Sequence, residues 1–166
     1  SIDESADLGA LGKLDIAIVC AGVKSILDVG ATLERLETLS IALVGYKTNA
    51  FPGFYLTDSG FTLEHRVDSA QEIAAIIKAR RELKTDSTAL VVANPVKEEM
   101  DRTRHDAILA SGLAGATAQG ITGKAVTPFL LEHFHTASHG ESLKVNIEII
   151  KSNSALAADI AVALTK

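Results

Sequence analysis

A lysine in a glycine-containing turn is the residue of this chain best suited to covalent chemistry. Lys24 follows Gly22 shortly after the apolar run Ile16 to Cys20. A neutral lysine amine attacks carbonyl carbons and forms a Schiff base, whereas a protonated lysine binds phosphate groups or is simply solvated. Which of these roles Lys24 takes depends on the elements that position it.

Those elements are predicted to be a buried strand and a helix, joined by the turn. The β-branched run Ile16 to Cys20 has no helical period and is typical of a parallel strand covered on both faces. Ser25 is predicted to cap a helix with apolar residues at helical spacing, namely Ile26, Leu27, Val29, Leu33 and Leu36. The dipole of that helix and partial burial both disfavour a protonated amine, and ligands bind at this end of parallel strands. We therefore expect Lys24 to face a ligand crevice.

Other polar residues lie where predicted elements begin or end. Ser5 and Asp7 suit the start of a short helix over residues 8–11, where they cap free amides or hold an anion. Asn94 follows the predicted strand 89–93. Its side chain either faces the same crevice as Lys24 or bonds its own backbone in a turn.

The last part of the chain holds asparagines and histidines at regular spacings. Asn146 and Asn153, seven residues apart on the last predicted helix, are either satisfied core amides or groups that recognise the amide edge of a ligand. His135 and His139 have the i, i+4 spacing of zinc ligands, but His133 is off that face and the glutamate of an HExxH motif is missing. A solvated histidine face is therefore favoured over a metal site.

The composition excludes several classes of function. The net charge is −5, the pI is near 5.5 and no cluster of Lys and Arg stands out, so a nucleic-acid partner is not expected. The single cysteine, Cys20, is predicted to be a packed apolar residue. Without a signal peptide or an apolar run of roughly 18 residues, we expect a cytoplasmic protein and no membrane partner. The first residue is Ser1 rather than methionine, which indicates a fragment or a processed chain.

The order of the predicted elements indicates an α/β fold with a layered sheet of mostly parallel, buried strands flanked by helices. The predicted strands span 16–20, 41–45 and 89–93, and the predicted helices span 8–11, 26–36, 69–83, 101–119, 127–139 and 141–164. Gly112 and Gly115 are expected to make their helix irregular. The aromatic-rich segment 47–61 is expected to form an ordered loop or an edge strand, as a lid or a subunit contact. Residues 1–166 are interpreted as one domain or the C-terminal portion of one.

Several motifs, taken in order, resemble one enzyme family. They are Asp3-x-Ser-Ala-Asp7, Val19-Cys-Ala-Gly-Val-Lys-Ser-Ile-Leu-Asp28, Val91-Val-Ala-Asn-Pro95, Gly123-Lys124, Thr127-Pro-Phe-Leu-Leu131 and Ser142-Leu-Lys-x-Asn146. Nearly from end to end, this set resembles the pseudouridine-5′-phosphate glycosidase family, also called indigoidine synthase A-like.

The resemblance implies reversible cleavage of the carbon–carbon bond between ribose and C5 of uracil, which gives uracil and ribose 5-phosphate. It makes Lys24 the nucleophile, which forms a Schiff base with the ring-opened ribose. It makes Asp3 the ligand of a divalent metal, typically Mn²⁺. The substrate contacts that it implies are Ser5, Ala6, Asp7 and, for uracil, Asn146. It also implies a homo-oligomer, because family members resemble trimers.

The chemistry of such a bond agrees with a lysine nucleophile. A carbon–carbon glycosidic bond offers no leaving-group oxygen to protonate, so the paired carboxylates of ordinary glycosidases are poorly suited to it. An imine supplies an electron sink beside the breaking bond, while a separate acid protonates C5 of the base. The implied enzyme is therefore a C-glycosidase of the lyase type.

Two motifs of the family are missing from this sequence. In a comparable stretch of chain before these motifs, family members carry a proton-donating glutamate in an A-L-E-S-T-like motif and a lysine that helps to bind substrate. The resemblance therefore implies the N-terminal half of the same enzyme as a partner, which would cover apolar sheet edges. Two alternatives stay open: a Schiff-base lyase or aldolase acting on another sugar phosphate, and a non-catalytic sugar-phosphate-binding subunit or fragment.

Overall fold

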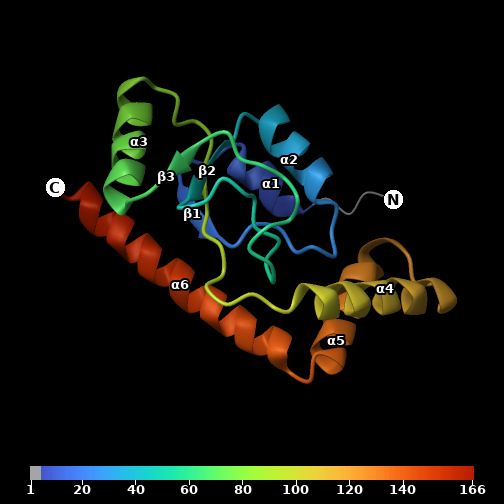
Figure 1. Ribbon diagram of the computed structural model, residues 1–166. Helices are drawn as coiled ribbons and strands as arrows, with labels where there is room; N and C mark the ends of the chain where they lie inside the picture. Colours follow the sequence, from blue (N-terminus) through green and yellow to red (C-terminus); the bar gives the residue numbers. More distant parts are fainter. Residues whose placement is uncertain (1–4) are drawn as a thin grey trace.

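A computed structural model describes residues 5–166 (Figure 1). Its strands are β1 (Ala17–Cys20), β2 (Ala42–Tyr46), β3 (Arg66–Val67) and β4 (Leu90–Ala93). Its helices are α1 (Ala6–Leu11), α2 (Val29–Thr38), α3 (Ala70–Glu82), α4 (Arg102–Ala118), the short 3-10 helix η1 (Gly123–Ala125), α5 (Val126–Ala137) and α6 (Glu141–Leu164). Every strand except the short β3, and every α-helix, corresponds to an element that the sequence predicts.

The strands form one parallel sheet in the order β1-β4-β2-β3. The central strand, β4, pairs through Leu90 with Ala17 of β1 on one side and with Ala42 of β2 on the other. All four residues of β4 are buried, which explains its continuous apolar sequence. The predicted α/β fold with a parallel sheet and flanking helices is confirmed.

Both faces of β1 are covered as predicted, since Val19 packs towards α3 and α6 and Ile18 and Cys20 pack towards α1 and α2, but β1 is an edge strand and is only partly buried. Within residues 5–166 it pairs with β4 alone, its first residue is exposed and the other three are half-buried. Periodicity reports that a strand is apolar, but it does not distinguish a central strand from an edge strand. Leu14 and Ile16, just before β1, are 46% and 41% exposed, so the expected apolar sheet edge is present.

Helices cover both faces of the sheet, and alternate residues of β4 contact the two layers. Leu90 and Val92 pack with Ile73 of α3 and with Leu156 and Ile160 of α6. Ala89 and Val91 face the other way and pack with Leu8 of α1 and Leu36 of α2. This alternation is the two-residue period of a strand, with both faces apolar. Helix α6 runs along the molecule from α5 at one end to α3 at the other (Figure 1).

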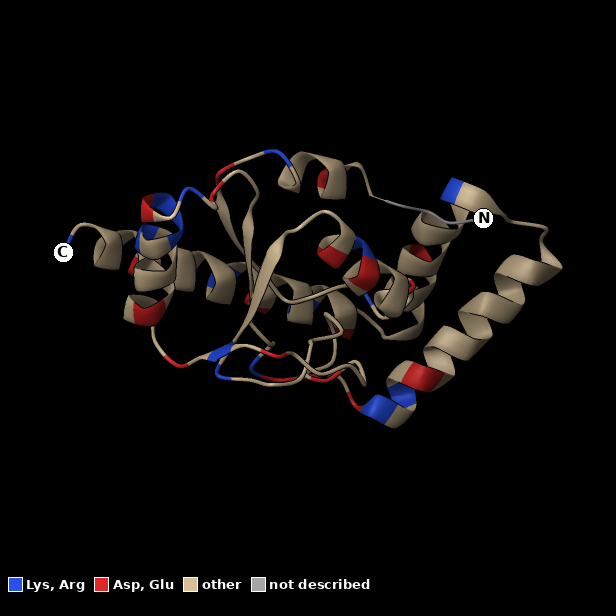
Figure 2. Cartoon of the chain, turned by 90° about the horizontal axis from the view of Figure 1, so that it is seen from above, with Lys and Arg blue, Asp and Glu red and all other residues tan. Residues whose placement is uncertain are grey.

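Helices α4 and α5 lie side by side and extend to one side of the sheet (Figures 1 and 2). Contrary to the prediction, Gly112 does not make α4 irregular. A Cβ built at Gly112 would lie 2.8 Å from a methyl carbon of Leu130 and 2.9 Å from a ring carbon of His133, both on α5. The glycine therefore allows the two helices to approach closely.

Two predicted helix ends differ from the structure near α5. Thr127 does not cap α5, because η1 runs directly into the helix and the N-cap position falls on Ala125. The helix also ends at Ala137 rather than at His139, which has a positive φ of 53° and is followed by Gly140 at 83°. His135 and His139 therefore do not share a helix face.

Charged side chains are scattered over most elements, whereas much of the α4–α5 pair carries none (Figure 2). Residues 107–118 of α4 contain no charged side chain. Among the helices of residues 5–166, none combines the length and the apolar character needed to cross a bilayer.

Candidate active site

The loop after β1 turns sharply at Gly22 and packs against the segment 47–61. Gly22 has a φ of +79°, and a Cβ built there would lie 1.9 Å from a backbone carbonyl oxygen of that segment. Glycine alone permits this approach of two backbones. Gly22 forms an antiparallel bridge with Gly53, and the amide of Phe54 donates a hydrogen bond to the carbonyl of Ala21 (3.0 Å). The predicted glycine turn is confirmed.

The helix after this loop starts later than predicted, and Ser25 does not cap it. The N-cap is Asp28, whose carboxylate accepts a hydrogen bond from the amide of Ala31 (2.9 Å). Aspartate caps a helix as well as serine does, and the hydroxyl of Ser25 is engaged elsewhere. Lys24 lies four residues before the N-cap, outside the first turn in which a helix dipole acts. The dipole therefore gives no reason for a neutral amine at Lys24.

An aromatic ring contacts the side chain of Lys24 instead. Lys24 is half-buried, and its Nζ lies 5.2 Å from the centre of the Phe54 ring, within the range of a cation–π contact. Phe54 has a φ of +66°, a left-handed conformation that costs a non-glycine residue about 1–3 kcal/mol. The segment 47–61, expected as a lid or a subunit contact, thus packs over the Lys24 loop within its own chain.

Ser25 makes a hydrogen bond to a buried histidine of α4. Its Oγ lies 2.5 Å from Nε2 of His105, and Nδ1 of His105 lies 2.9 Å from a carboxylate oxygen of Asp106. His105 is 1% exposed, with ring centres of Phe134 and Tyr55 at 5.3 and 6.5 Å. Sequence reasoning missed His105, because 80 residues separate it from Ser25 and no local pattern joins the two.

Asn94 has a role that differs from both interpretations of its sequence position. It is 7% exposed, and its Nδ2 donates hydrogen bonds to Oγ of Ser152 (3.1 Å) and Oδ1 of Asn153 (2.9 Å). The side chain therefore neither faces an open crevice nor bonds its own backbone. It ties the carboxyl end of β4 to α6, and Asn153 is a half-buried amide whose Oδ1 accepts a hydrogen bond from Asn94.

Asn146 is half-buried like Asn153, but its side chain has no hydrogen-bond partner within residues 5–166. Its amide is available to a ligand. Ser5, Ala6 and Asp7 are exposed at the start of α1, and Oγ of Ser5 accepts a hydrogen bond from the amide of Asp7 (3.2 Å), which confirms the predicted cap. Asp3 lies outside the described residues.

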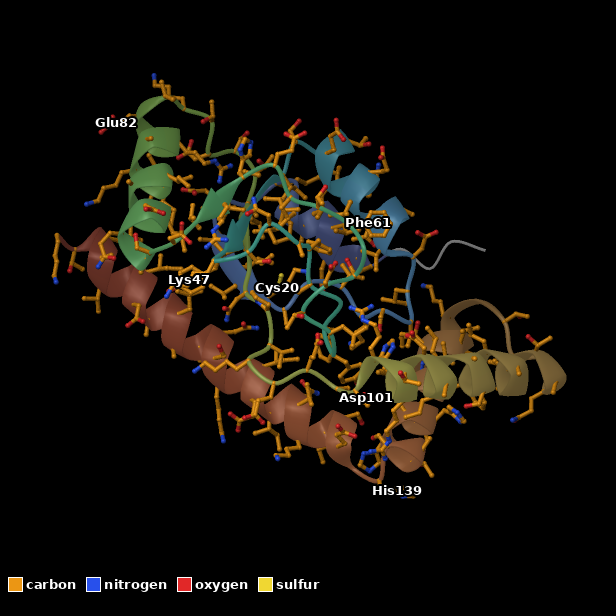
Figure 3. All side chains as sticks on the ribbon, in the orientation of Figure 1. Cys20, Lys47, Phe61, Glu82, Asp101 and His139 are labelled. Atoms are coloured by element: carbon orange, nitrogen blue, oxygen red, sulfur yellow. The ribbon has the colours of Figure 1, made fainter. Side chains whose placement is uncertain are left out.

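The predicted histidine face is divided between two surroundings. His133 lies 2.8 Å through Nε2 from Oγ of Ser111 and stacks on Phe129, whereas His135 and His139 are exposed. Figure 3 shows His139 in the turn between α5 and α6. Over residues 5–166, no three or more His, Cys, Asp or Glu side chains gather in a way that would hold a metal ion.

Burial shifts the pKa of Cys20, and hydrogen bonds shift the pKa of Glu99. Burial raises the pKa of the Cys20 thiol, which packs among apolar residues as predicted. The hydroxyl and the amide of Thr57 donate hydrogen bonds of 2.6 and 2.7 Å to the carboxylate of Glu99. These bonds hold the pKa of Glu99 below its usual value of 4.5 and tie the segment 47–61 to the loop before α4.

Replacing Glu99 by glutamine should remove a pH-dependent part of the stability. A lowered pKa in the folded state gives stability that is complete above the usual pKa and is lost as pH falls through the lowered value. At pH 6, we expect the melting temperature of the unaltered chain to exceed that of Glu99→Gln by at most a few °C. This difference in melting temperature should become smaller by pH 3. A gap that stays constant with pH in thermal melts would contradict this role of Glu99.

The family model described as "Indigoidine synthase A like protein" matches residues 1–163. The chain belongs to the indigoidine synthase A-like family. A pseudouridine-5′-phosphate glycosidase of Salinispora tropica is 59% identical over 165 residues, covering 98% of this chain and 51% of the relative. One of Frankia alni is 54% identical over 165 residues, covering 98% and 45%. The chain thus spans about half the length of the curated relatives it matches.

Two solved structures have the same fold as this chain. The prealnumycin C-glycosynthase AlnA, solved in complex with ribulose 5-phosphate, superposes with a TM-score of 0.89 at 28% identity, over 96% of this chain and 53% of that one. An indigoidine synthase A-like protein of Thermotoga maritima superposes with a TM-score of 0.85 at 36% identity, over 99% and 55%.

Proposed function

We propose that this chain is the C-terminal half of a pseudouridine-5′-phosphate glycosidase, and that Lys24 is its nucleophile. The observation that carries the proposal is the position of Lys24, a half-buried amine on a glycine turn at the carboxyl end of a parallel strand, against the ring of Phe54. The names of the Salinispora tropica and Frankia alni relatives support the activity. The sugar phosphate bound by AlnA supports the substrate class.

The proposed reaction balances with one lysine and one acid. The C1′–O4′ bond of the ribose ring breaks as the amine of Lys24 bonds to C1′, and O4′ takes up the proton that the amine loses. The bond between C1′ and C5 of uracil then breaks. The electron pair of that bond stays on C5, which an acid of the N-terminal half protonates. Water hydrolyses the imine, which releases ribose 5-phosphate and restores the amine. Each step is reversible, as the resemblance implies.

Two further groups of this chain are proposed to hold the substrate. The exposed start of α1, at Ser5, Ala6 and Asp7, offers a hydroxyl, backbone amides and a carboxylate to the sugar phosphate. Asn146 offers an unused carboxamide, which has the donor and acceptor pair needed for the amide edge of uracil. No hydrogen bond or ion pair of residues 5–166 joins these groups to Lys24, so the substrate itself would bridge them.

Asp3 is proposed to bind a divalent metal ion, which the resemblance implies is Mn²⁺. Since residues 5–166 contain no ready cluster of ligands, one carboxylate with water and substrate oxygens would hold the ion. When bound, the ion would supply positive charge for substrate oxygens, and no step of the reaction above passes through it.

Replacing Asp3 by alanine should raise the Mn²⁺ concentration that half-saturates the activity by at least about tenfold, because one carboxylate anchors the ion. Asp159→Ala, which removes an exposed carboxylate of α6, is the matched control and should leave the Mn²⁺ dependence unchanged. Circular dichroism should show both variants folded. An unchanged Mn²⁺ dependence in Asp3→Ala would show that Asp3 does not bind the metal.

The N-terminal half of the enzyme is proposed to cover the open edge of β1. The exposed residues Leu14 and Ile16 mark this edge. A hollow of about 220 Å³ also lies there, at the amino ends of β1 and β4, lined in part by Ile16, Arg80 and Ile160. It is at the opposite end of β1 from Lys24, so it suits a partner segment rather than the substrate.

We also propose that the protein forms a homo-oligomer, which the resemblance implies is a trimer. An apolar stripe on the outer face of α6 supports it, since Leu143, Ile147 and Ile150 recur at helical spacing and are 50%, 47% and 62% exposed. Light scattering at several concentrations measures the assembly.

The decisive test uses this chain joined to the N-terminal half of the Salinispora tropica relative, here called the completed enzyme. Incubation with pseudouridine 5′-phosphate should release uracil and ribose 5-phosphate in equal amounts. A sugar-phosphate adduct on Lys24 without uracil release would favour a Schiff-base lyase or aldolase with another substrate. Binding of ribose 5-phosphate without any adduct would favour a non-catalytic subunit.

A further inference from the structure

We propose that the hydrogen bond between Ser25 and His105 positions Lys24 for attack, so that Ser25 and His105 are positioning residues of the reaction. This inference rests on the proposed role of Lys24 as nucleophile. It adds a second requirement, which is that α4 holds the loop that carries the lysine.

The loop is fixed on both sides of Lys24. Two residues before the lysine, Gly22 is bridged to Gly53, and one residue after it, Ser25 Oγ lies 2.5 Å from Nε2 of His105. The carbonyl of Lys24 also accepts a hydrogen bond from the amide of Leu27 (2.8 Å). The backbone of Lys24 is therefore held by the segment 47–61 on one side and by α4 on the other.

The surroundings of His105 determine which atom donates. Nδ1 lies 2.9 Å from the carboxylate of Asp106, which accepts hydrogen bonds, so Nδ1 carries a proton. In the neutral imidazole Nε2 is then an acceptor, and the hydroxyl of Ser25 donates to it. Because this tautomer is set by Asp106, the bond fixes the direction of the Ser25 side chain and not only its distance.

Packing holds the histidine in place. His105 is 1% exposed and lies beside the rings of Tyr55 and Phe134, which stack on each other with centres 5.5 Å apart. Phe54, whose ring contacts Lys24, meets Tyr55 edge to face at 4.9 Å. The amine of Lys24 and the hydroxyl of Ser25 thus both contact one aromatic cluster, so the position of Lys24 depends on how this cluster holds His105.

The test compares Ser25→Ala with Ser25→Thr, which keeps a hydroxyl, in the completed enzyme. Ser111→Ala is the matched control, because it removes a serine hydroxyl 2.8 Å from Nε2 of another histidine, His133, away from the loop. Ribose 5-phosphate and cyanoborohydride trap the imine, and peptide mass locates and times the adduct on Lys24. Steady-state kinetics with pseudouridine 5′-phosphate separate kcat from KM.

We expect Ser25→Ala to lower the trapping rate and kcat by about 10–100-fold with little change in KM, because a misplaced reacting group slows the chemistry more than it weakens binding. Ser25→Thr should restore most of the rate. The Ser111→Ala enzyme should form the trapped adduct at the native rate. Its melting temperature should fall by as much as that of Ser25→Ala. Trapping by Ser25→Ala within twofold of the native rate would overturn the inference and leave the nucleophile standing. Absence of an adduct on Lys24 in the unaltered enzyme would overturn both.

Discussion

Replacing Lys24 by arginine should abolish uracil release by the completed enzyme, with a loss on the order of 10³-fold or more in kcat. Arginine keeps the positive charge but remains protonated, so it does not form an imine. Its guanidinium still stacks on the ring of Phe54 and still attracts a phosphate group. Binding of ribose 5-phosphate, measured by calorimetry, should therefore change only a few-fold.

The chain offers a matched control for this change. Lys47 also has its Nζ over an aromatic ring, 5.0 Å from the centre of Tyr46, but it lies outside the Lys24 loop. Lys47→Arg should leave uracil release and imine trapping unchanged. If Lys24→Arg keeps substantial turnover, Lys24 is a phosphate-binding cation and the Schiff-base mechanism is wrong for this protein.

The 166-residue chain alone should release no measurable uracil, and the N-terminal half should restore activity when joined or mixed with it. Without a positioned acid, protonation of C5 is lost, and general acid catalysis alone is worth about 10²–10⁴-fold. The measurement is uracil release by the chain, by the N-terminal half and by the two together.

This experiment separates the lysine from the acid. The chain alone should still form a trapped adduct with ribose 5-phosphate if its loop is held as described, because the imine needs no proton donor to uracil. Mixing the N-terminal half with Lys24→Arg should give no activity, which shows that the active lysine comes from this chain. Turnover by the chain without a partner would sink the prediction and place the acid within these 166 residues.

Local patterns predicted most of the fold, because each depends on a few neighbouring residues. Ser69 caps α3 and α6 begins at Glu141, as capping and periodicity indicate, and Gly22 makes the predicted turn. The errors arise where two local signals compete. Asp28 caps α2 in place of Ser25, and Gly112 serves a contact with α5 rather than a break in α4.

The candidate site was less predictable, because its contacts join distant parts of the chain. The position of Lys24 after a strand is a local feature, but its ring partner Phe54 and the histidine that binds Ser25 come from other segments. The position of Asn94 after a predicted strand does not distinguish a contact with a ligand from the hydrogen bonds that it makes to α6. Whether a strand lies at the edge or in the centre of the sheet also depends on the strand order, and this decides how far β1 is buried.

The strand order also has a consequence for how the chain is made. Ala17 of β1 and Ala42 of β2 do not pair with each other, since each pairs with Leu90 of the strand synthesised last. Until β4 leaves the ribosome, β1 has no hydrogen-bonding neighbour among residues 5–166 and β2 has only the two-residue β3, and the long loops that their pairing with β4 closes slow the search. The nascent chain is therefore exposed to aggregation during this interval, and the sheet assembles late, around its central strand.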